Sequence, residues 1–223
     1  MRELNGVPLL AYAIGAAQEA GIFHRTWVSS DDEDTLVLAA DYLEDGIGLR
    51  LRKPELAQDD SPDIGWVTEI AELAHCDAFA ILRPTSPFRR GPWIRKAWEI
   101  LQACPRADSI RAVRPCREHP AKMWRYHVPS AFMSPVLSGI GYEAPWHSMP
   151  TQLLPTVFTQ TAALEIAWTR VLPGSISGQM VLPYYTEADA PEAIDINTAE
   201  DFDYATLIAA EHPEYLPPVH SCG

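Results

Sequence analysis

The amino-acid sequence predicts an α/β fold, Rossmann-like and three-layered, in which helices cover both faces of a mostly parallel sheet. The main observation is that apolar segments with helical spacing alternate with short β-rich segments along the first half of the chain. A second observation is that prolines or glycines bound several of the helical segments. The length of 223 residues and the 47% share of hydrophobic residues fit a single domain over 1–223 with a sizeable core.

The elements follow in order along the chain. Residues 8–20 carry apolar side chains on one helical face, with Pro8 in the first turn and Gly21 directly after the last. Near the other end, Thr198 is expected to cap a helix in which Asp201 is the third residue. Further helices are predicted over 33–44, 63–75, 92–103 and 199–211, and strands over 26–30, 49–52, 78–82, 109–113, 164–168 and 181–185, with a strand end at 193–197.

The regular alternation stops at residues 115–160. This stretch holds seven prolines, with Trp124, Tyr126 and Trp146 among them. We expect an irregular arm that packs on a partner subunit or covers the active-site cleft. The alternative is an ordinary long surface loop.

Composition excludes several classes of protein. The net charge of −13 and the lack of a Lys/Arg cluster argue against a nucleic-acid partner, although a small anion needs only a few local cations. The four cysteines show no C-x-x-C spacing, as is typical of reduced cytosolic thiols. The apolar runs are shorter than the ~18 residues of a membrane span, and the first residues do not resemble a signal peptide. A cytoplasmic protein is therefore expected.

Polar and charged side chains follow four of the predicted strands. Ligands bind beyond the carboxyl ends of strands in an open parallel sheet, so we expect the loops carrying Asp31, Ser86 and Asp195 to converge on one crevice. Each of these polar segments also has a simpler explanation, as a helix cap, a proline-bounded turn or a turn residue. The four segments are Ser29–Asp32, Arg52–Pro62, Arg83–Arg89 and Asp195–Asn197.

These residue types suit nucleotidyl transfer. Hydroxyls and backbone amides can hold a base and a ribose, and a carboxylate can hold Mg²⁺, which prefers oxygen ligands. Cations can neutralise the charge that develops on the attacked phosphate.

Six segments together resemble the acylneuraminate cytidylyltransferases and their relatives for legionaminic, pseudaminic and ketodeoxyoctonic acids. The motif P-T-S-P-[LF]-R within the fourth segment and D-I-[DN]-T-x-[ED]-D within the sixth are specific in combination, and the matches occur in family order over nearly the whole chain. The segments are Asn5–Tyr12, Val28–Asp31, Glu55–Asp59, Arg83–Arg89, His119–Lys122 and Ile194–Phe202.

The resemblance implies a nucleotide-diphospho-sugar transferase fold, a homodimer, CTP as co-substrate and Mg²⁺ as cofactor. The implied reaction transfers CMP to a nonulosonic or ulosonic acid, an acidic nine- or eight-carbon sugar, for surface glycans such as lipopolysaccharide. By position, Lys122 and Asp195 would be catalytic, with Asp195 and Asn197 at the metal. Arg89 would anchor its loop. The residues near the nucleotide would be Arg52, Ser61, Thr85 and Ser86, beside Asp31.

The chain departs from the family pattern at four places. The family opens with a strand and a basic glycine-rich triphosphate loop, whereas this sequence starts at the segment that follows it. Asn197 stands where a second carboxylate is usual. Residues 159–165 and Thr151 differ where the sugar would bind, which favours an acid other than N-acetylneuraminic acid.

Two alternatives stay open. One is a non-catalytic homologue or a truncated fragment without turnover, since the triphosphate loop is not in the sequence. The other is a nucleotidyltransferase for a different base or sugar, although enzymes that activate hexose phosphates lack the D-I-[DN]-T-x-[ED]-D turn as spaced here.

Overall fold

The computed structural model describes residues 2–42, 47–137, 145–187 and 190–220. Its main sheet has four strands in the order β10-β6-β9-β5. β6 and β10 run parallel, and β9 runs antiparallel to both of its neighbours, so β5, β6 and β10 share one direction. The strands are β5 (Ala78–Ile81), β6 (Ser109–Pro115), β9 (Phe158–Trp168) and β10 (Val181–Tyr185).

A second, parallel pair of strands lies beside this sheet. It consists of β3 (Thr26–Ser30) and β4 (Ile47–Leu51). Within the described part of the chain, no strand pairs with the outer edge of β5 or with the second edge of β3. Ahead of them, β1 (Glu3–Leu4) and β2 (Val7–Pro8) form a small hairpin around Asn5 and Gly6, which both adopt positive φ.

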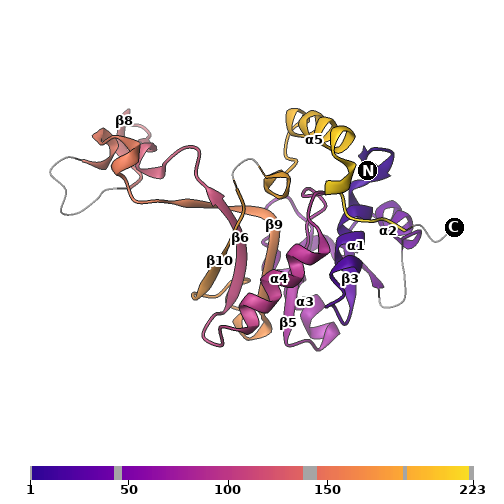
Figure 1. Cartoon of the computed structure of the whole chain (residues 1–223). Coiled ribbons are helices and arrows are strands. Elements are labelled where there is room, and N and C mark those ends of the chain that lie inside the picture. The colour runs from indigo at the N-terminus through magenta and orange to yellow at the C-terminus, as the bar shows by residue number, and fades with distance from the viewer. Residues whose placement is uncertain (1, 43–46, 138–144, 188–189, 221–223) are drawn as a thin grey trace.

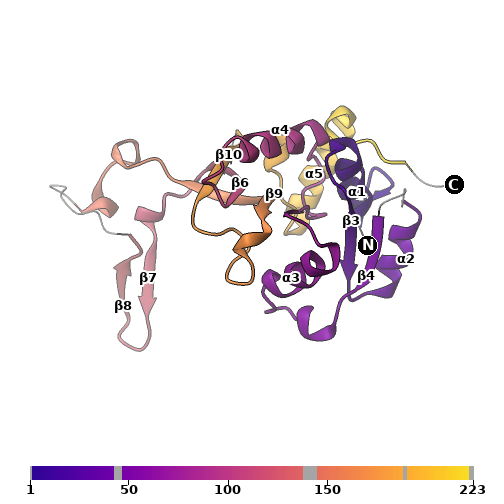
Figure 2. The ribbon, with the colours of Figure 1, turned by 90° about the horizontal axis from the view of Figure 1, so that it is seen from below.

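Helices lie on both sides of the strands. α4 packs on β6 and β9 and against α1, and α3 lies on the opposite side of the sheet (Figure 2). Ala20, Ile94 and Leu101 are fully buried in the core between α1, α4 and the sheet. The helices are α1 (Leu9–Ala20), α2 (Glu33–Ala40), α3 (Asp63–Ala74), α4 (Gly91–Gln102) and α5 (Ala199–Glu211).

The predicted α/β fold with a mostly parallel sheet is confirmed, and all five predicted helices are present. Two local predictions were wrong. Helix α2 ends at Ala40, where a helix over 33–44 was expected, and 43–46 lie outside the described residues. Residues 193–197 were expected to be a strand end, but Ala193 is the last residue of a 3₁₀ turn, Pro191–Ala193, and 194–197 are irregular chain.

The arm, residues 115–160, projects away from the rest of the molecule (Figure 1). It contains an antiparallel hairpin of β7 (Trp124–His127) and β8 (Phe132–Pro135), and short 3₁₀ turns around it. Its return segment becomes β9, which explains why β9 enters the sheet antiparallel to its neighbours. No helix in the described ranges has the length and apolarity to cross a bilayer.

Candidate active site

Two of the predicted loops meet at one point. The backbone N–H of Ile196 donates a hydrogen bond to the carbonyl oxygen of Thr85 at 2.9 Å, which joins the Asp195 turn to the loop after β5. The side chain of Ser86 in that loop is 3% exposed, and its hydroxyl has no hydrogen-bond partner among the described residues. The Thr85–Ser86 loop and the Asp195 turn are therefore in contact, and their role in binding a nucleotide stays a prediction.

Arg89 anchors this loop to the sheet, as expected. Its guanidinium is 1% exposed and donates hydrogen bonds to the carbonyl oxygens of Ala163 at 2.5 Å and Arg83 at 3.3 Å. Burial lowers the pKa of Arg89 to about 9. Because its contacts are with the backbone, Arg89 holds the loop and does not face a ligand.

The Asp195 turn is fixed by the start of α5. The carboxylate of Asp201 accepts hydrogen bonds from the backbone N–H groups of Asn197 at 3.1 Å and Thr198 at 2.9 Å, and these bonds lower its pKa. The Asn197 amide donates to one oxygen of Asp195 at 2.9 Å. The other oxygen, Oδ1, is buried without a hydrogen-bond partner in the part of the chain that is described. Asp195 therefore has one carboxylate oxygen that no described residue bonds and that is shielded from solvent.

Two cavities adjoin Asp195. The larger has a volume of about 530 Å³ and lies between β9, the end of β6 and the start of α5, with Arg114 and Arg117 on its wall. The smaller has a volume of about 180 Å³ and is lined by residues of β5, β6 and β9. Gln160, Thr161 and Asp195 line both, so the two cavities adjoin each other at Asp195.

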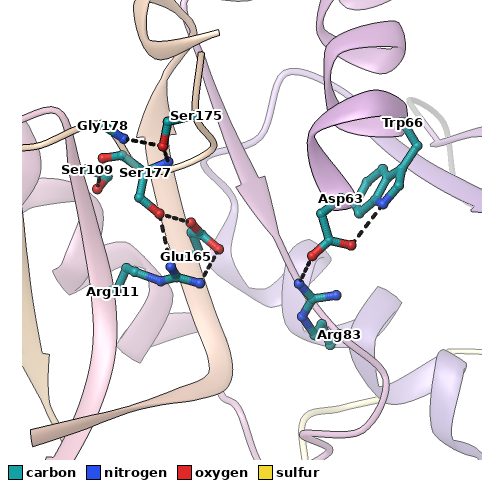
Figure 3. Close-up of polar contacts among 9 residues, drawn as sticks. All are labelled: Asp63, Trp66, Arg83, Ser109, Arg111, Glu165, Ser175, Ser177 and Gly178. Carbon is teal, nitrogen blue, oxygen red and sulfur yellow. Dashed lines mark hydrogen bonds and ion pairs between the residues drawn. The ribbon is translucent and has the colours of Figure 1, made fainter. Parts of the chain in front are cut away.

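Two ion pairs border the smaller cavity (Figure 3). Arg111 donates to the carboxylate of Glu165 at 2.7 Å, and the hydroxyl of Ser177 donates to the other oxygen of Glu165. Burial raises the pKa of Glu165, against the hydrogen bond from Ser177 and the charge of Arg111. Arg83 pairs with Asp63 on α3.

A second polar cluster lies at the ends of β3 and β4. The guanidinium of Arg52 donates to the hydroxyl of Ser29 at 3.2 Å and to its carbonyl oxygen at 2.9 Å, and lies 4.8 Å from the ring of Trp66. Trp66 in turn donates to Asp63 at 3.0 Å. Burial by itself would raise the pKa of Asp63, but the hydrogen bonds from Arg83 and Trp66 outweigh it, and the pKa is lowered. The predicted nucleotide residue Arg52 is thus linked, through Trp66 and Asp63, to Arg83 in the loop after β5.

Of the predicted site residues, only Asp195 and Asn197 line the cavities, and Arg52, Thr85, Ser86, Ser61 and Asp31 line neither. Ser61 closes its own turn by donating to the carbonyl oxygen of Glu55 at 3.1 Å. Asp31 is exposed, and its neighbour Asp32 caps α2 by accepting from Asp34 and Thr35. The convergence of Asp31 with Ser86 and Asp195 stays a prediction.

Lys122 lies in the arm. Its ammonium group donates to the backbone carbonyl oxygens of His147 at 2.9 Å and Met149. Lys122 lines neither cavity. Within one chain, the two predicted catalytic residues are therefore not brought together.

Sequence reasoning missed Arg111 and did not single out Thr161 or Glu165 within residues 159–165, the segment placed near the sugar. Arg111 and Glu165 are charged residues inside segments that read as buried strands, which was the available signal. Their common location follows from the pairing of β6 with β9, and local patterns do not predict that pairing.

Parts of the chain resemble characterised proteins. N-acylneuraminate cytidylyltransferase of Escherichia coli is 32% identical over 107 residues, which is 48% of this chain and 25% of that protein. CMP-N,N'-diacetyllegionaminic acid synthase of Legionella pneumophila is 35% identical over 105 residues, which is 44% of each chain. The chain is thus similar to acylneuraminate cytidylyltransferases over about half of its length. The match spans less than half the length of both relatives, and no family model matches the chain.

Two solved structures have the same overall fold as this chain. A CMP:2-keto-3-deoxy-manno-octonic acid synthetase complexed with CTP superposes with a TM-score of 0.63, over 95% of this chain and 91% of that one. A 4-diphosphocytidyl-2C-methyl-D-erythritol synthase from Anaerococcus prevotii also gives 0.63, over 93% and 91%. Both are 11% identical in sequence, so the likeness concerns the fold alone.

Proposed function

We propose that this protein transfers CMP from CTP to an acidic nine- or eight-carbon sugar, giving a CMP-sugar and pyrophosphate for surface-glycan synthesis. The observation that carries the proposal is the buried, unpartnered oxygen of Asp195, which lies where two cavities and the Thr85–Ser86 loop meet. The sequence relatives named above are cytidylyltransferases for sugars of this kind.

In the proposed reaction the anomeric hydroxyl oxygen of the sugar attacks the α-phosphorus of CTP. A new P–O bond forms, the bond from the α-phosphorus to the bridging oxygen breaks, and pyrophosphate leaves with that electron pair. The hydroxyl proton passes to solvent or to a base. Arg52, Ser61, Thr85 and Ser86, with Asp31, are proposed to hold the nucleotide.

Mg²⁺ fits the Asp195 turn. Asp195 offers one free carboxylate oxygen, and the amide of Asn197 adjoins it. No group of three or more His, Cys, Asp or Glu side chains suited to a metal occurs among the described residues. This matches a cation that takes one or two protein ligands and completes its shell with phosphates and water. When bound, such an ion would neutralise charge on the phosphates.

Lys122 can act at Asp195 only if it comes from another molecule or the arm moves, because it lies in the projecting arm. We propose a homodimer in which the arm of one subunit packs on the other and brings Lys122 to the acidic sugar. The exposed apolar side chains of the arm support this proposal. Phe132 and Val128 are 76% and 77% exposed.

Pyrophosphate release tests the proposed function. CTP and Mg²⁺ are supplied with a panel of nonulosonic and ulosonic acids, using both the 223-residue chain and the product of the longest in-frame reading frame that contains it. Release with at least one acid is expected. Absence of release with every acid, in both proteins, would favour the non-catalytic alternative.

The role of Asp195 is tested with Asp195→Ala. Turnover should fall at least about 100-fold, because the carboxylate oxygen that serves the phosphates is lost. Asp203→Ala is the matched control, since Asp203 is an exposed carboxylate on α5. Thermal unfolding should be similar in both variants. Full activity of Asp195→Ala would remove Asp195 from the mechanism.

A further inference from the structure

Asp63 is the first residue of α3 and directly follows the segment Arg52–Pro62. Both of its carboxylate oxygens are used. Oδ1 accepts a hydrogen bond from the indole N–H of Trp66 at 3.0 Å, and Oδ2 accepts one from the guanidinium of Arg83 (Figure 3). The helix dipole favours a carboxylate at this end of a helix, and Trp66 lies one turn further along the same face. Asp63 therefore holds one group of its own helix and one group of the loop after β5.

Trp66 extends this connection to the loop after β4. The guanidinium of Arg52 lies 4.8 Å from the centre of the Trp66 ring, within the range of a cation–π contact. Arg52 also donates two hydrogen bonds to Ser29 at the end of β3. Asp63 is thus connected, through Trp66, to the ends of both β3 and β4.

Arg83 extends the connection in the other direction. Its carbonyl oxygen accepts a hydrogen bond from the backbone N–H of Ser86 at 3.2 Å. Thr85 of the same loop accepts one from the N–H of Ile196 in the Asp195 turn. The four polar segments that were expected to line one crevice are therefore linked to one another, and the two halves of the link meet at Asp63.

The alternative explanation for Asp63 is an ordinary surface ion pair. The side chains of Arg83 and Asp63 are 35% and 31% exposed, and a pair with this exposure adds little to stability on its own. Asp63 differs from such a pair because its second oxygen holds an indole that contacts a second cation. Two directional hydrogen bonds on one carboxylate fix the geometry of both donors.

We propose that Asp63 is a positioning residue for the nucleotide: it holds the Arg52 loop and the Arg83 loop in a fixed orientation to each other, and the affinity for CTP depends on that orientation. Arg52 has no carboxylate partner among the described residues, whereas Arg83 is paired with Asp63, so Arg52 is the guanidinium left to face a phosphate. The link to CTP rests on the proposed function. The coupling between the two loops rests on the contacts of Asp63 alone.

Steady-state kinetics of pyrophosphate release test the effect on CTP. Asp63→Asn can accept only one of the two hydrogen bonds well, so the KM for CTP should rise about tenfold, and the KM for the acidic sugar should stay within about twofold. A merely structural role would lower the melting temperature without separating the two KM values. Asp63→Glu keeps the charge but moves the carboxylate by one methylene, and it should raise the KM for CTP as well.

Glu72→Gln is the matched control for the kinetics. It removes the same charge at an exposed position on the same helix and should leave both KM values unchanged. If Asp63→Asn does not fold, Asp63→Glu decides the question.

An NMR signal reports on the coupling without CTP. The indole N–H signal of Trp66 in the isotope-labelled whole chain is assigned by its absence from Trp66→Phe. Arg83→Gln removes one partner of Asp63, so the Trp66 signal should shift although Trp66 itself is unchanged. Arg106→Gln, the same change at an exposed arginine, should leave the signal in place.

The proposal is overturned if Asp63→Asn has the KM for CTP of the parent or a lower one, or if the Trp66 signal does not respond to Arg83→Gln. A lower KM would mean that Asp63 acts only through its negative charge. A parent that never releases pyrophosphate contradicts the proposed function and with it the link to CTP, and the Trp66 signal then decides whether Asp63 couples the loops. A protein that consumes CTP but shows no shift of the Trp66 signal keeps the proposed function and loses the coupling.

Discussion

The α/β body and the arm differ in how far their large apolar side chains are buried. In the body, Ile94 and Leu101 are fully buried between helices and sheet. In the arm, Tyr126 and Phe132 are 59% and 76% exposed on a hairpin of two short strands. An isolated two-stranded hairpin is only marginally stable in water, and contiguous exposed apolar surface marks a contact site. The comparison teaches that the body has a buried core of its own, whereas the arm has none and leaves its aromatic side chains open to a second surface.

The largest expected effect is on the oligomeric state. Combining Tyr126→Ser with Phe132→Ser should convert the proposed dimer to monomers, because aromatic side chains that are buried at the centre of an interface contribute about 2 kcal/mol or more each. The dissociation constant should rise roughly 30-fold or more per ring. Light scattering after gel filtration measures the mass.

Leu207→Ser is the control for the dimer. Leu207 is 53% exposed on α5, in the body, and its replacement should leave the mass unchanged. A parent protein that is monomeric at every concentration, or a double variant that stays dimeric, would contradict the role given to the arm.

A pair of identical substitutions sharpens the contrast in stability. Leu101→Ala, in the buried core, should lower the free energy of unfolding by about 2–5 kcal/mol, because it leaves a cavity. Leu153→Ala, in the arm where the side chain is 64% exposed, should cost less than about 0.5 kcal/mol in the monomer. Urea denaturation at concentrations where the protein is monomeric measures both. Equal costs would mean that the arm is packed on the body in solution.

Some elements of the fold could be predicted from local sequence signals, and others could not. Helix α5 was predicted from Thr198 and Asp201, and the structure has the predicted capping box. Such local signals lie within a few residues of the element that they start. Residues 193–197 alternate like a strand, but tertiary contacts decided otherwise: Ile194 and Ile196 pack in the cluster of α5, and the N–H of Ile196 bonds to Thr85.

The candidate site was predictable in part. Thr85 and Ser86 do follow strand β5, as expected of a ligand-binding loop, whereas Asp195 follows a 3₁₀ turn and is joined to that loop by the hydrogen bond from Ile196 to Thr85. The small cavity could not be predicted, because it depends on a bulge in β9 and on the pairing of Arg111 with Glu165 across two strands that are 54 residues apart in sequence. Local patterns contain no information on that register.

The smallest expected effect is at the start of α5. Thr198→Ala removes the side-chain cap that accepts from the N–H of Asp201, and should cost about 1 kcal/mol, or roughly 2–4 °C in melting temperature. Thr198→Ser keeps the hydroxyl and should cost little. The hydrogen bonds to Asp201 lower its pKa from the usual value of an aspartate, so their stabilisation is present above the unfolded-state pKa and is lost as pH falls through the folded-state pKa.

The cost of Thr198→Ala should therefore shrink below about pH 4, since the Thr198 hydroxyl also donates to the Asp201 carboxylate at 2.9 Å. Thermal unfolding of the parent, Thr198→Ala and Thr198→Ser between pH 3 and 7 measures this dependence. A cost that does not change with pH would show that Asp201 does not depend on the hydroxyl. In that case the backbone bonds from Asn197 and Thr198 alone would hold the Asp195 turn in place.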